Sequence, residues 1–147
     1  MDPSSPAPPP AAAPSAIGPL RVLIVEDHAP TRAAIALLLE HEFPRMVVIG
    51  TASDGDAALR AVVDSAPEVV VLDLDLNGKD GLELMPAINR EPGIAVIILT
   101  SSDDPMARPR ALAAGAKNFI SKLSPAQELI SAILAVRPEL AGIGPLS

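Results

Sequence analysis

The chain has 147 residues, with 18 acidic against 11 basic side chains and a formal net charge of −7. This acidic balance argues against a nucleic-acid-binding surface, because phosphate backbones are held mainly by lysine and arginine. The absence of cysteine excludes disulfides, thiol nucleophiles and cysteine-based zinc sites, and the only aromatic residues, two phenylalanines, exclude a base-stacking platform. A core built from this composition must be aliphatic.

The first 19 residues are almost entirely proline, alanine and serine, with seven prolines among them. Such a segment has too little apolar bulk to offset the entropy lost on ordering, so we expect a disordered tail over residues 1–19. It has neither the basic start nor the apolar stretch of a secretory signal. No apolar run approaches the roughly 20 residues of a membrane-spanning helix. We therefore expect a soluble, cytoplasmic protein without a membrane partner.

From Leu20 onward, short apolar runs alternate with segments whose apolar residues recur at helical spacing. The runs predict strands and the periodic segments predict helices. The predicted strands are Leu20–Val25, Met46–Ile49, Val69–Leu72, Ile94–Leu99 and Asn118–Ile120. The predicted helices are Thr31–Glu40, Asp54–Asp64, Leu82–Ile88, a fourth that contains Ala111–Ala114, and a fifth that begins at Ser124-Pro125 and ends near Pro138.

Strands that are apolar throughout suit a parallel sheet covered on both faces, and the intervening helices supply the crossovers that parallel strands require. We therefore predict one α/β domain over residues 20–137. A short C-terminal tail over residues 138–147 is expected to follow it.

Polar residues follow the ends of four predicted strands. Glu26 and Asp27 follow the first strand, Asp73 the third, Thr100 the fourth and Lys122 the fifth. Ligands of open α/β sheets bind at the carboxyl ends of the strands. Each residue alone is more simply explained as a turn or capping residue. Together, at one edge of the sheet, they predict a functional site.

The chemistry of this set is coherent. Clustered carboxylates repel one another unless a cation lies among them, and oxygen ligands suit Mg²⁺, so we expect Glu26, Asp27 and Asp73 to bind this ion. Beside a metal, one carboxylate can act as a nucleophile toward phosphorus. The Lys122 ammonium and the Thr100 hydroxyl suit the oxygens of the transferring phosphoryl group, and the product is an aspartyl phosphate.

Four stretches that contain these residues carry a family resemblance. They are Arg21–His28, Val71–Gly81, Ile97–Ser102 and Gly115–Lys122, in chain order and with fitting spacing. Through them, the chain from about residue 20 to residue 137 resembles the receiver domain of two-component response regulators. The resemblance implies a flavodoxin-like, doubly wound sheet of five parallel strands in the order 2-1-3-4-5, with five helices.

The resemblance also implies roles for individual residues. Asp73 matches the phosphoacceptor, which takes a phosphoryl group from a sensor histidine kinase or a histidine phosphotransfer protein. Glu26 and Asp27 match the acidic pair that holds Mg²⁺, and Asp75 occupies the position whose backbone carbonyl completes the metal site.

Further implied roles concern a conformational switch. Thr100 matches the switch hydroxyl, Lys122 the phosphate-binding lysine and Phe119 the switch aromatic. Phosphorylation would draw the Thr100 hydroxyl inward and allow Phe119 to move, which changes the surface offered to a downstream protein partner. Asp75 and Ser102 occupy positions that affect the access of the hydrolytic water in this family. We therefore expect them to modulate the lifetime of the phosphoryl group.

Two positions depart from the family pattern: Leu123 after the lysine, and Asn77 four residues past the acceptor, where proline is frequent. Neither change removes a reactive group. We expect His28, which follows the acidic pair, to begin a helix rather than to bind metal. His28 and the Lys122–Pro125 pattern resemble a subfamily whose members usually carry a helix-turn-helix output domain.

The fourth predicted helix contains Pro105 and Pro109. Pro109 lacks the N–H that would bond back to the carbonyl of Pro105, and its ring crowds that carbonyl. We therefore predict a helix that is short, late-starting or irregular at its N-terminus.

The chain ends at Ser147, and on that basis we expect a stand-alone receiver that labels itself and turns over no separate substrate. The alternative is the receiver part of a longer DNA-binding transcription regulator. A remoter alternative is an aspartate-nucleophile phosphatase, because Asp73 and Asp75 after an apolar strand resemble its opening motif. A second copy of this chain is a further candidate partner.

Overall fold

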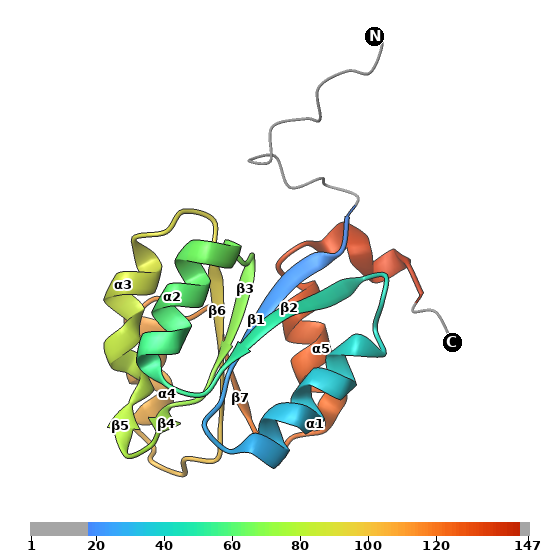
Figure 1. Ribbon diagram of the computed structural model, residues 1–147. Helices are drawn as coiled ribbons and strands as arrows, with labels where there is room; N and C mark the ends of the chain where they lie inside the picture. The colour runs from blue at the N-terminus through green and yellow to red at the C-terminus, as the bar shows by residue number, and fades with distance from the viewer. Residues whose placement is uncertain (1–17, 145–147) are drawn as a thin grey trace, which may run out of the picture.

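Five aliphatic segments form the central parallel sheet of the computed structural model, which describes residues 18–144 (Figure 1). They are β1 (Leu20–Val25), β2 (Met46–Ala52), β3 (Val69–Leu72), β6 (Ala95–Thr100) and β7 (Asn118–Ser121). Their order across the sheet is β2-β1-β3-β6-β7, which confirms the flavodoxin-like order expected for five successive strands. The predicted tail over residues 1–19 lies outside the described residues, apart from Gly18 and Pro19.

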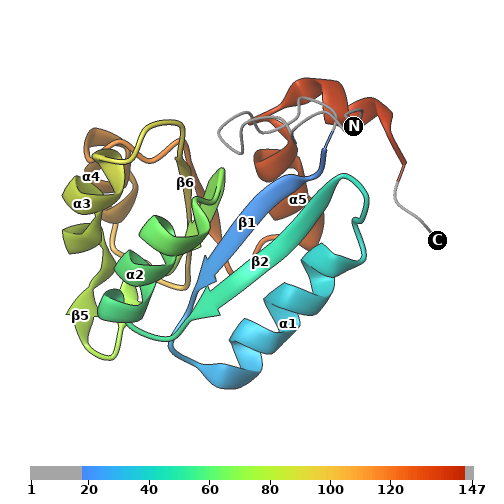
Figure 2. The same cartoon turned by 45° about the horizontal axis from the view of Figure 1, so that its top comes forward.

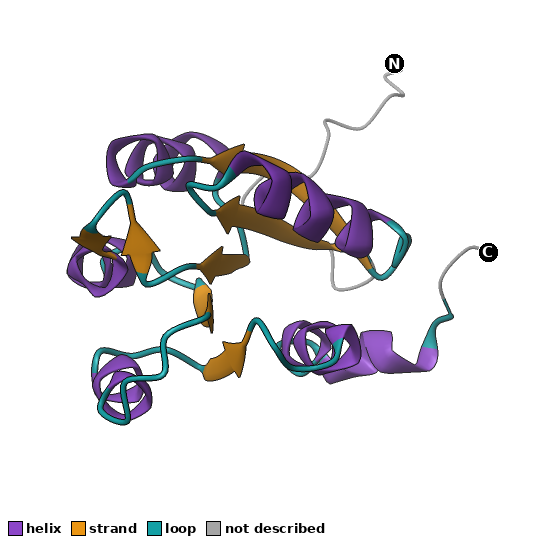
Figure 3. Ribbon diagram, turned by 90° about the horizontal axis from the view of Figure 1, so that it is seen from below, coloured by secondary structure: helices purple, strands orange, loops and turns teal. Residues whose placement is uncertain are grey.

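Helices cover both faces of this sheet (Figures 1 and 2). They are α1 (Ala29–Glu40), α2 (Gly55–Ser65), α3 (Met85–Asn89), α4 (Ala107–Ala113) and α5 (Ala126–Leu134). Helices α1 and α5 lie on one face, and α2, α3 and α4 lie on the other (Figure 3). The doubly wound α/β fold predicted from the sequence is confirmed.

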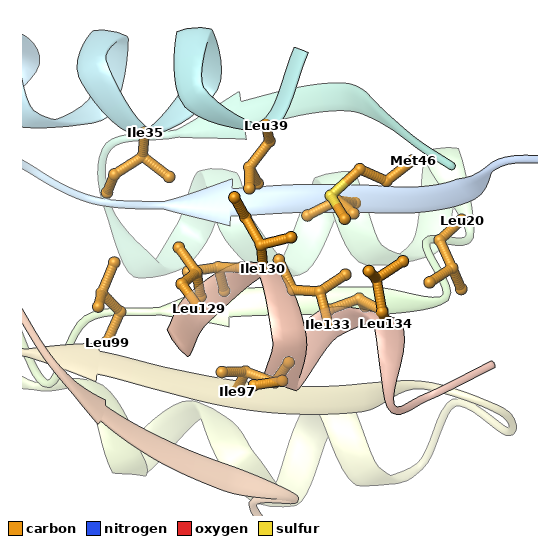
Figure 4. Packing of buried hydrophobic residues seen from close by; sticks show 14 of the residues in the cluster. Leu20, Ile35, Leu39, Met46, Ile97, Leu99, Leu129, Ile130, Ile133 and Leu134 are labelled. Atoms are coloured by element: carbon orange, nitrogen blue, oxygen red, sulfur yellow. The ribbon is translucent and has the colours of Figure 1, made fainter. Parts of the chain in front are cut away.

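Alternate residues of each strand serve two separate cores, because successive side chains point to opposite faces. On β1, Val22 and Ile24 pack in the core under α1 and α5, whereas Leu23 and Val25 pack in the core under α2, α3 and α4. Figure 4 shows the first core, where Ile35 and Leu39 of α1 approach side chains of α5. Burial on both faces explains why the strands are apolar without alternation.

Side chains begin the first two helices. The Nδ1 atom of His28 accepts a hydrogen bond from the backbone N–H of Thr31 at 3.3 Å, which makes His28 the N-cap of α1. Asp54 Oδ1 caps α2 by accepting from the N–H of Ala57 at 2.8 Å. The expectation that His28 begins a helix is confirmed.

Helix α4 has the shortened form that its prolines predict. It begins only at Ala107, two residues after Pro105, and has seven residues. Pro109 therefore lies in the first turn, where its missing N–H removes no hydrogen bond of the helix. Its N-cap residue, Met106, makes no side-chain hydrogen bond to the start of the helix.

The segment after β3 differs from the prediction. A helix over Leu82–Ile88 was expected, but Gly81–Leu84 forms a 3₁₀ turn, η1, and the α-helix begins at Met85. Pro86 explains the late start, because it lacks the N–H that would bond back to the carbonyl of Leu82.

A small antiparallel hairpin, absent from the prediction, precedes η1. It pairs β4 (Asp75–Leu76) with β5 (Lys79–Asp80). Asn77 and Gly78 form its turn with φ angles of 55° and 80°. Asn-Gly is the preferred pair for such a two-residue turn, because both residues tolerate positive φ.

The packed residues continue beyond Arg137, where we expected the domain to end. A 3₁₀ helix, η2 (Pro138–Gly142), follows α5, and its Leu140 is buried in the core under α1 and α5. Arg137 Nη2 lies 3.0 Å from Glu68 Oε1, and Arg137 Nη1 donates to the carbonyl of Gly18 at 2.8 Å. The end of the helical region is thus joined to the start of the described chain.

Truncation of Leu140 tests whether η2 belongs to the folded unit. We expect Leu140→Ala to lower the free energy of unfolding by about 2–5 kcal/mol, because it leaves a cavity in a closed aliphatic core. Ile143→Ala, at a side chain that is 42% exposed, is the matched control and is expected to change stability by less than about 0.5 kcal/mol. Urea denaturation of both variants makes the comparison, and equal losses would contradict the packing of η2.

Candidate functional site

Three carboxylates gather at the carboxyl ends of β1 and β3, the edge of the sheet that faces the viewer in Figure 3. Val25 pairs with Leu72 in the sheet register, so Glu26 and Asp73, the residues that follow them, lie side by side. One oxygen from each of Glu26, Asp27 and Asp73 lies within 4.8 Å of the others. Glu26 and Asp73 are buried, with exposed fractions of 1% and 5%.

A single ammonium group lies against two of these carboxylates. Lys122, directly after β7, places its Nζ atom 2.6 Å from Glu26 Oε1 and 2.9 Å from Asp73 Oδ2. Its backbone N–H donates to the carbonyl of Thr100 at 2.8 Å, which positions the side chain at the same edge. Glu26, Asp73 and Lys122 therefore meet as predicted from the strand ends.

Burial and pairing act in opposite directions on this charge cluster. Burial raises the pKa of the Glu26 carboxyl, and the Lys122 ammonium offsets part of that increase. Burial by itself lowers the pKa of Lys122, but hydrogen bonds and charge attraction from Glu26 and Asp73 outweigh it, so the pKa is raised. The pKa of Asp27 is lowered, chiefly because its carboxylate accepts the backbone N–H of Asn77 at 3.0 Å.

The donor set fits a divalent cation. Three carboxylates face one ammonium group, so the ionised cluster keeps a negative charge that a bound cation would neutralise. All three side chains offer oxygen, the ligand atom that Mg²⁺ prefers, and Asp27 is partly open to solvent for the waters that this ion retains. The acidic cluster can therefore bind a metal ion.

Several groups that shape the site have no clear signal in the sequence. Arg32 of α1 donates from Nη1 to the backbone carbonyls of Glu26 and Asp27, at 2.9 and 3.4 Å. The backbone N–H of Asp75 donates to Asp73 Oδ1 at 3.2 Å. These contacts depend on loop conformation. Only the position of Arg32, in the first turn of the helix that follows the acidic pair, could have suggested its role.

The remaining predicted site residues lie outside the cluster of Glu26, Asp27, Asp73 and Lys122. Thr100 is buried, and its hydroxyl accepts the backbone N–H of Ser102 at 3.2 Å. Ser102 Oγ accepts the N–H of Asp104, and Asp75 Oδ1 accepts the N–H of Gly78 at 3.1 Å within the hairpin turn. Ser102 and Asp75, the two residues expected to modulate the lifetime of the phosphoryl group, thus accept hydrogen bonds from nearby backbone N–H groups.

Phe119 is not part of the acidic cluster. It is half-buried on β7, where it pairs with Ile98 of β6. Its ring packs against the core under α2, α3 and α4.

This fold and site define the class of protein. Residues 22–134 match the family model of the response regulator receiver domain. The chain therefore belongs to the receiver domains of two-component response regulators. This membership favours a receiver over the aspartate-nucleophile phosphatase considered from the sequence.

Two named relatives illustrate the range of the family. The chain is 40% identical over 118 residues to the transcriptional regulatory protein LiaR of Bacillus subtilis, covering 79% of this chain and 55% of that protein. It is 35% identical over 121 residues to a protein-glutamate methylesterase/protein-glutamine glutaminase of Geobacter sulfurreducens, covering 82% of this chain and 32% of the relative. The chain thus spans about a third to just over half of these relatives.

Solved structures agree with this assignment. A two-component response regulator of the LuxR family from Aurantimonas superposes with a TM-score of 0.74 at 32% identity, covering 88% of this chain and 90% of that one. The signal receiver domain of the putative response regulator NarL from Mycobacterium tuberculosis has a TM-score of 0.75 at 29% identity, covering 82% and 98%.

Within the described residues, no helix is both long and apolar enough to cross a membrane.

Proposed function

We propose that Asp73 accepts a phosphoryl group from a phosphohistidine and thereby switches a protein-binding surface. The observation that carries this proposal is the position of the Asp73 carboxylate, which lies between two other carboxylates and the Lys122 ammonium at a strand end of the receiver fold. An isolated acid at that place would need no such surroundings. A carboxylate that binds a metal ion and receives a phosphoryl group needs both the neighbouring carboxylates and the ammonium group.

The residues divide the chemistry among them. Glu26, Asp27 and Asp73, with the backbone carbonyl of Asp75, would hold Mg²⁺, which supplies positive charge to the phosphoryl oxygens. An Asp73 oxygen forms the new bond to phosphorus as the bond from phosphorus to the donor imidazole breaks. The donor ring, protonated on its other nitrogen, takes the electron pair of that bond and leaves as neutral imidazole. Lys122 pairs with the phosphoryl oxygens that replace part of its contact with Asp73.

The partners follow from this chemistry. The donor is a sensor histidine kinase or a histidine phosphotransfer protein, and the reaction takes place in the cytoplasm. Thr100 turns its hydroxyl toward the new phosphoryl group, and Phe119 moves in response. A downstream protein partner binds the altered surface, and the domain turns over no separate substrate.

Phosphotransfer to the full chain tests the proposal. Incubated with a radiolabelled, autophosphorylated histidine kinase and Mg²⁺, the wild-type chain is expected to acquire label, and Asp73→Asn to lose at least about 100-fold of it because an amide is a poor nucleophile. Asp64→Asn, at an exposed helix position, is the matched control. Label that survives in Asp73→Asn would refute the acceptor assignment.

Asp75 is expected to influence how long the phosphoryl group persists. Its carboxylate accepts the N–H of Gly78, so Asp75→Asn keeps an acceptor oxygen for the turn while removing a negative charge beside the acceptor. We expect the dephosphorylation rate to change by about twofold to tenfold, because one charge acts close to the hydrolytic water. The rate at which wild type and variant lose label after the donor is removed measures dephosphorylation. Equal rates would contradict a role of Asp75.

A further inference from the structure

One side chain of α4 contacts both the ring and the backbone of Phe119. The guanidinium carbon of Arg108 lies 5.9 Å from the centroid of the Phe119 ring, within the range of a cation–π interaction. Arg108 Nη1 also donates to the carbonyl oxygen of Phe119 at 3.2 Å. The ring therefore cannot move far from its present position without losing contact with Arg108.

Strand register connects this contact to the acidic site. Phe119 of β7 pairs with Ile98 of β6, and Thr100 follows Ile98 by two residues. Because side chains two residues apart point to the same face, Thr100 and Phe119 share the face of the sheet that α4 covers. Thr100 and the ring that Arg108 contacts therefore lie on the same face of neighbouring strands.

Helix α4, which carries Arg108, is stabilised mainly by contacts with neighbouring elements. Its seven residues include Pro109, no side chain caps its start, and a helix of this length is not stable by itself. A second arginine, Arg110, places Nη2 2.7 Å from Asp80 Oδ2 in the hairpin that follows Asp73. Contacts from two arginines therefore tie α4 to the elements on either side of it.

Phe119 lies beside a shallow, open hollow of the surface. Arg108 and Phe119 line a hollow of about 560 Å³ between α4 and α5, together with Asn118, Glu128 and Ser131. The ring is only half-buried there, so its position depends on the contacts at this surface as well as on the core.

We propose that Arg108 is a positioning residue that restrains Phe119 and α4 in their unphosphorylated arrangement, so that activation must displace it. This inference rests on the proposed function, in which Phe119 moves on phosphorylation. Removing a restraint that acts only in the resting state raises the active population and, by linkage, the affinity for a phosphoryl mimic by the same factor. For one exposed cation–π contact and one hydrogen bond, that factor is about fivefold.

Fluorine NMR offers a direct readout, because the chain has only two phenylalanines and no tyrosine or tryptophan. Full-length protein labelled with 4-fluorophenylalanine therefore has two resonances, from Phe119 and from Phe43. Phe43 lies in the turn after α1 and serves as an internal reference. Each sample is titrated with beryllium fluoride in excess MgCl₂, because beryllium fluoride bound to a carboxylate mimics a phosphoryl group.

The variants are Arg108→Ala, Arg108→Lys and the matched control Lys117→Ala, which removes an exposed positive charge just before β7. We expect Arg108→Ala to shift the resting Phe119 resonance toward its beryllium fluoride-bound position and to lower the midpoint of the titration about fivefold. Arg108→Lys keeps the charge without the planar donor group and should give a smaller change. Lys117→Ala and the Phe43 resonance should remain as in wild type.

Two outcomes would overturn the inference and are distinguishable. A wild-type Phe119 response with an unchanged resting shift and midpoint in Arg108→Ala refutes the role of Arg108 alone. Absence of any Phe119 response in wild type and variants alike refutes the proposed switch as well, and the labelling of Asp73 then decides whether the acceptor assignment survives.

Discussion

Replacing Lys122 with methionine is expected to lower the free energy of unfolding of the metal-free protein by about 3 kcal/mol at neutral pH. The ammonium is the cation in contact with the buried Glu26 and Asp73 carboxylates, at 2.6 and 2.9 Å. Methionine has nearly the same length but no charge, so it leaves two adjacent carboxylates buried without compensation. Removal of one partner of a buried pair costs much more than the pair contributes in a wild-type protein.

Chemical denaturation in the presence of EDTA measures this effect. Lys117→Met, at an exposed lysine, is the matched control and should change stability by less than about 0.5 kcal/mol. Adding MgCl₂ is expected to recover part of the loss in Lys122→Met, because a bound divalent ion supplies the missing positive charge. Equal stabilities of the two variants in EDTA would show that Lys122 does not compensate the cluster.

The same prediction has a pH signature. The pKa of Lys122 is raised above its ordinary value of 10.5, so its stabilising contribution is complete below pH 10.5 and is lost as pH rises through the raised pKa. The pKa of Glu26 is raised above 4.5, so the contribution of its protonated form is complete below pH 4.5 and is lost as pH rises through that raised pKa. The deficit of Lys122→Met should therefore be largest near neutrality and shrink toward both extremes.

Substitution of Gly81 by alanine is expected to destabilise the fold by about 1–3 kcal/mol and to reduce phosphorylation of Asp73 at least tenfold. A Cβ atom at Gly81 would lie 2.2 Å from the backbone oxygen of Asp73 and 3.1 Å from Cα of Leu74. The two segments approach this closely because the N–H of Gly81 donates to the carbonyl of Leu74 at 2.6 Å. Because the obstructing atoms belong to the backbone, the acceptor residue itself must move.

Gly78→Ala, in the hairpin that precedes Gly81, separates destabilisation from displacement of the acceptor. Gly78 has a φ of +80°, so alanine is strained there, but its Cβ would meet no atom within 4 Å. We expect a loss of about 1–2 kcal/mol with phosphorylation of Asp73 retained. Kinase labelling and urea denaturation of both variants provide the comparison. Equal labelling of the two variants would contradict a displaced acceptor in Gly81→Ala.

The arrangement of the strands was predictable because its physical cause is local. Val69–Leu72 and the other central strands are apolar at successive positions, which follows from burial on both faces of the sheet. The late start of α4 was predictable as well, since Pro105 and Pro109 act on their own backbone. Less predictable was the hairpin over residues 75–80, whose strands have two residues each and too little length for a periodic pattern.

In the site, sequence position predicted which residues converge but not how they are held. Glu26, Asp73 and Lys122 follow strand ends, and parallel strands bring those ends to one edge. The contacts of Arg32 and Arg108 depend instead on the path of long side chains, which reach backbone carbonyls 6 and 11 residues away along the chain. Spacing along the chain does not by itself specify which backbone group such a side chain reaches.

The hydrogen bond between Arg137 and Gly18 has a consequence for protein engineering. Both residues lie at the edge of the sheet opposite Asp73, where Arg137 also pairs with Glu68, the residue just before β3. The start of the described fold therefore lies beside the residue that leads into η2, and ends that lie near each other favour insertion of a domain into a surface loop of another protein. A cassette that runs from Gly18 through the end of η2 would keep Leu140 in the core and present its acidic edge away from the carrier.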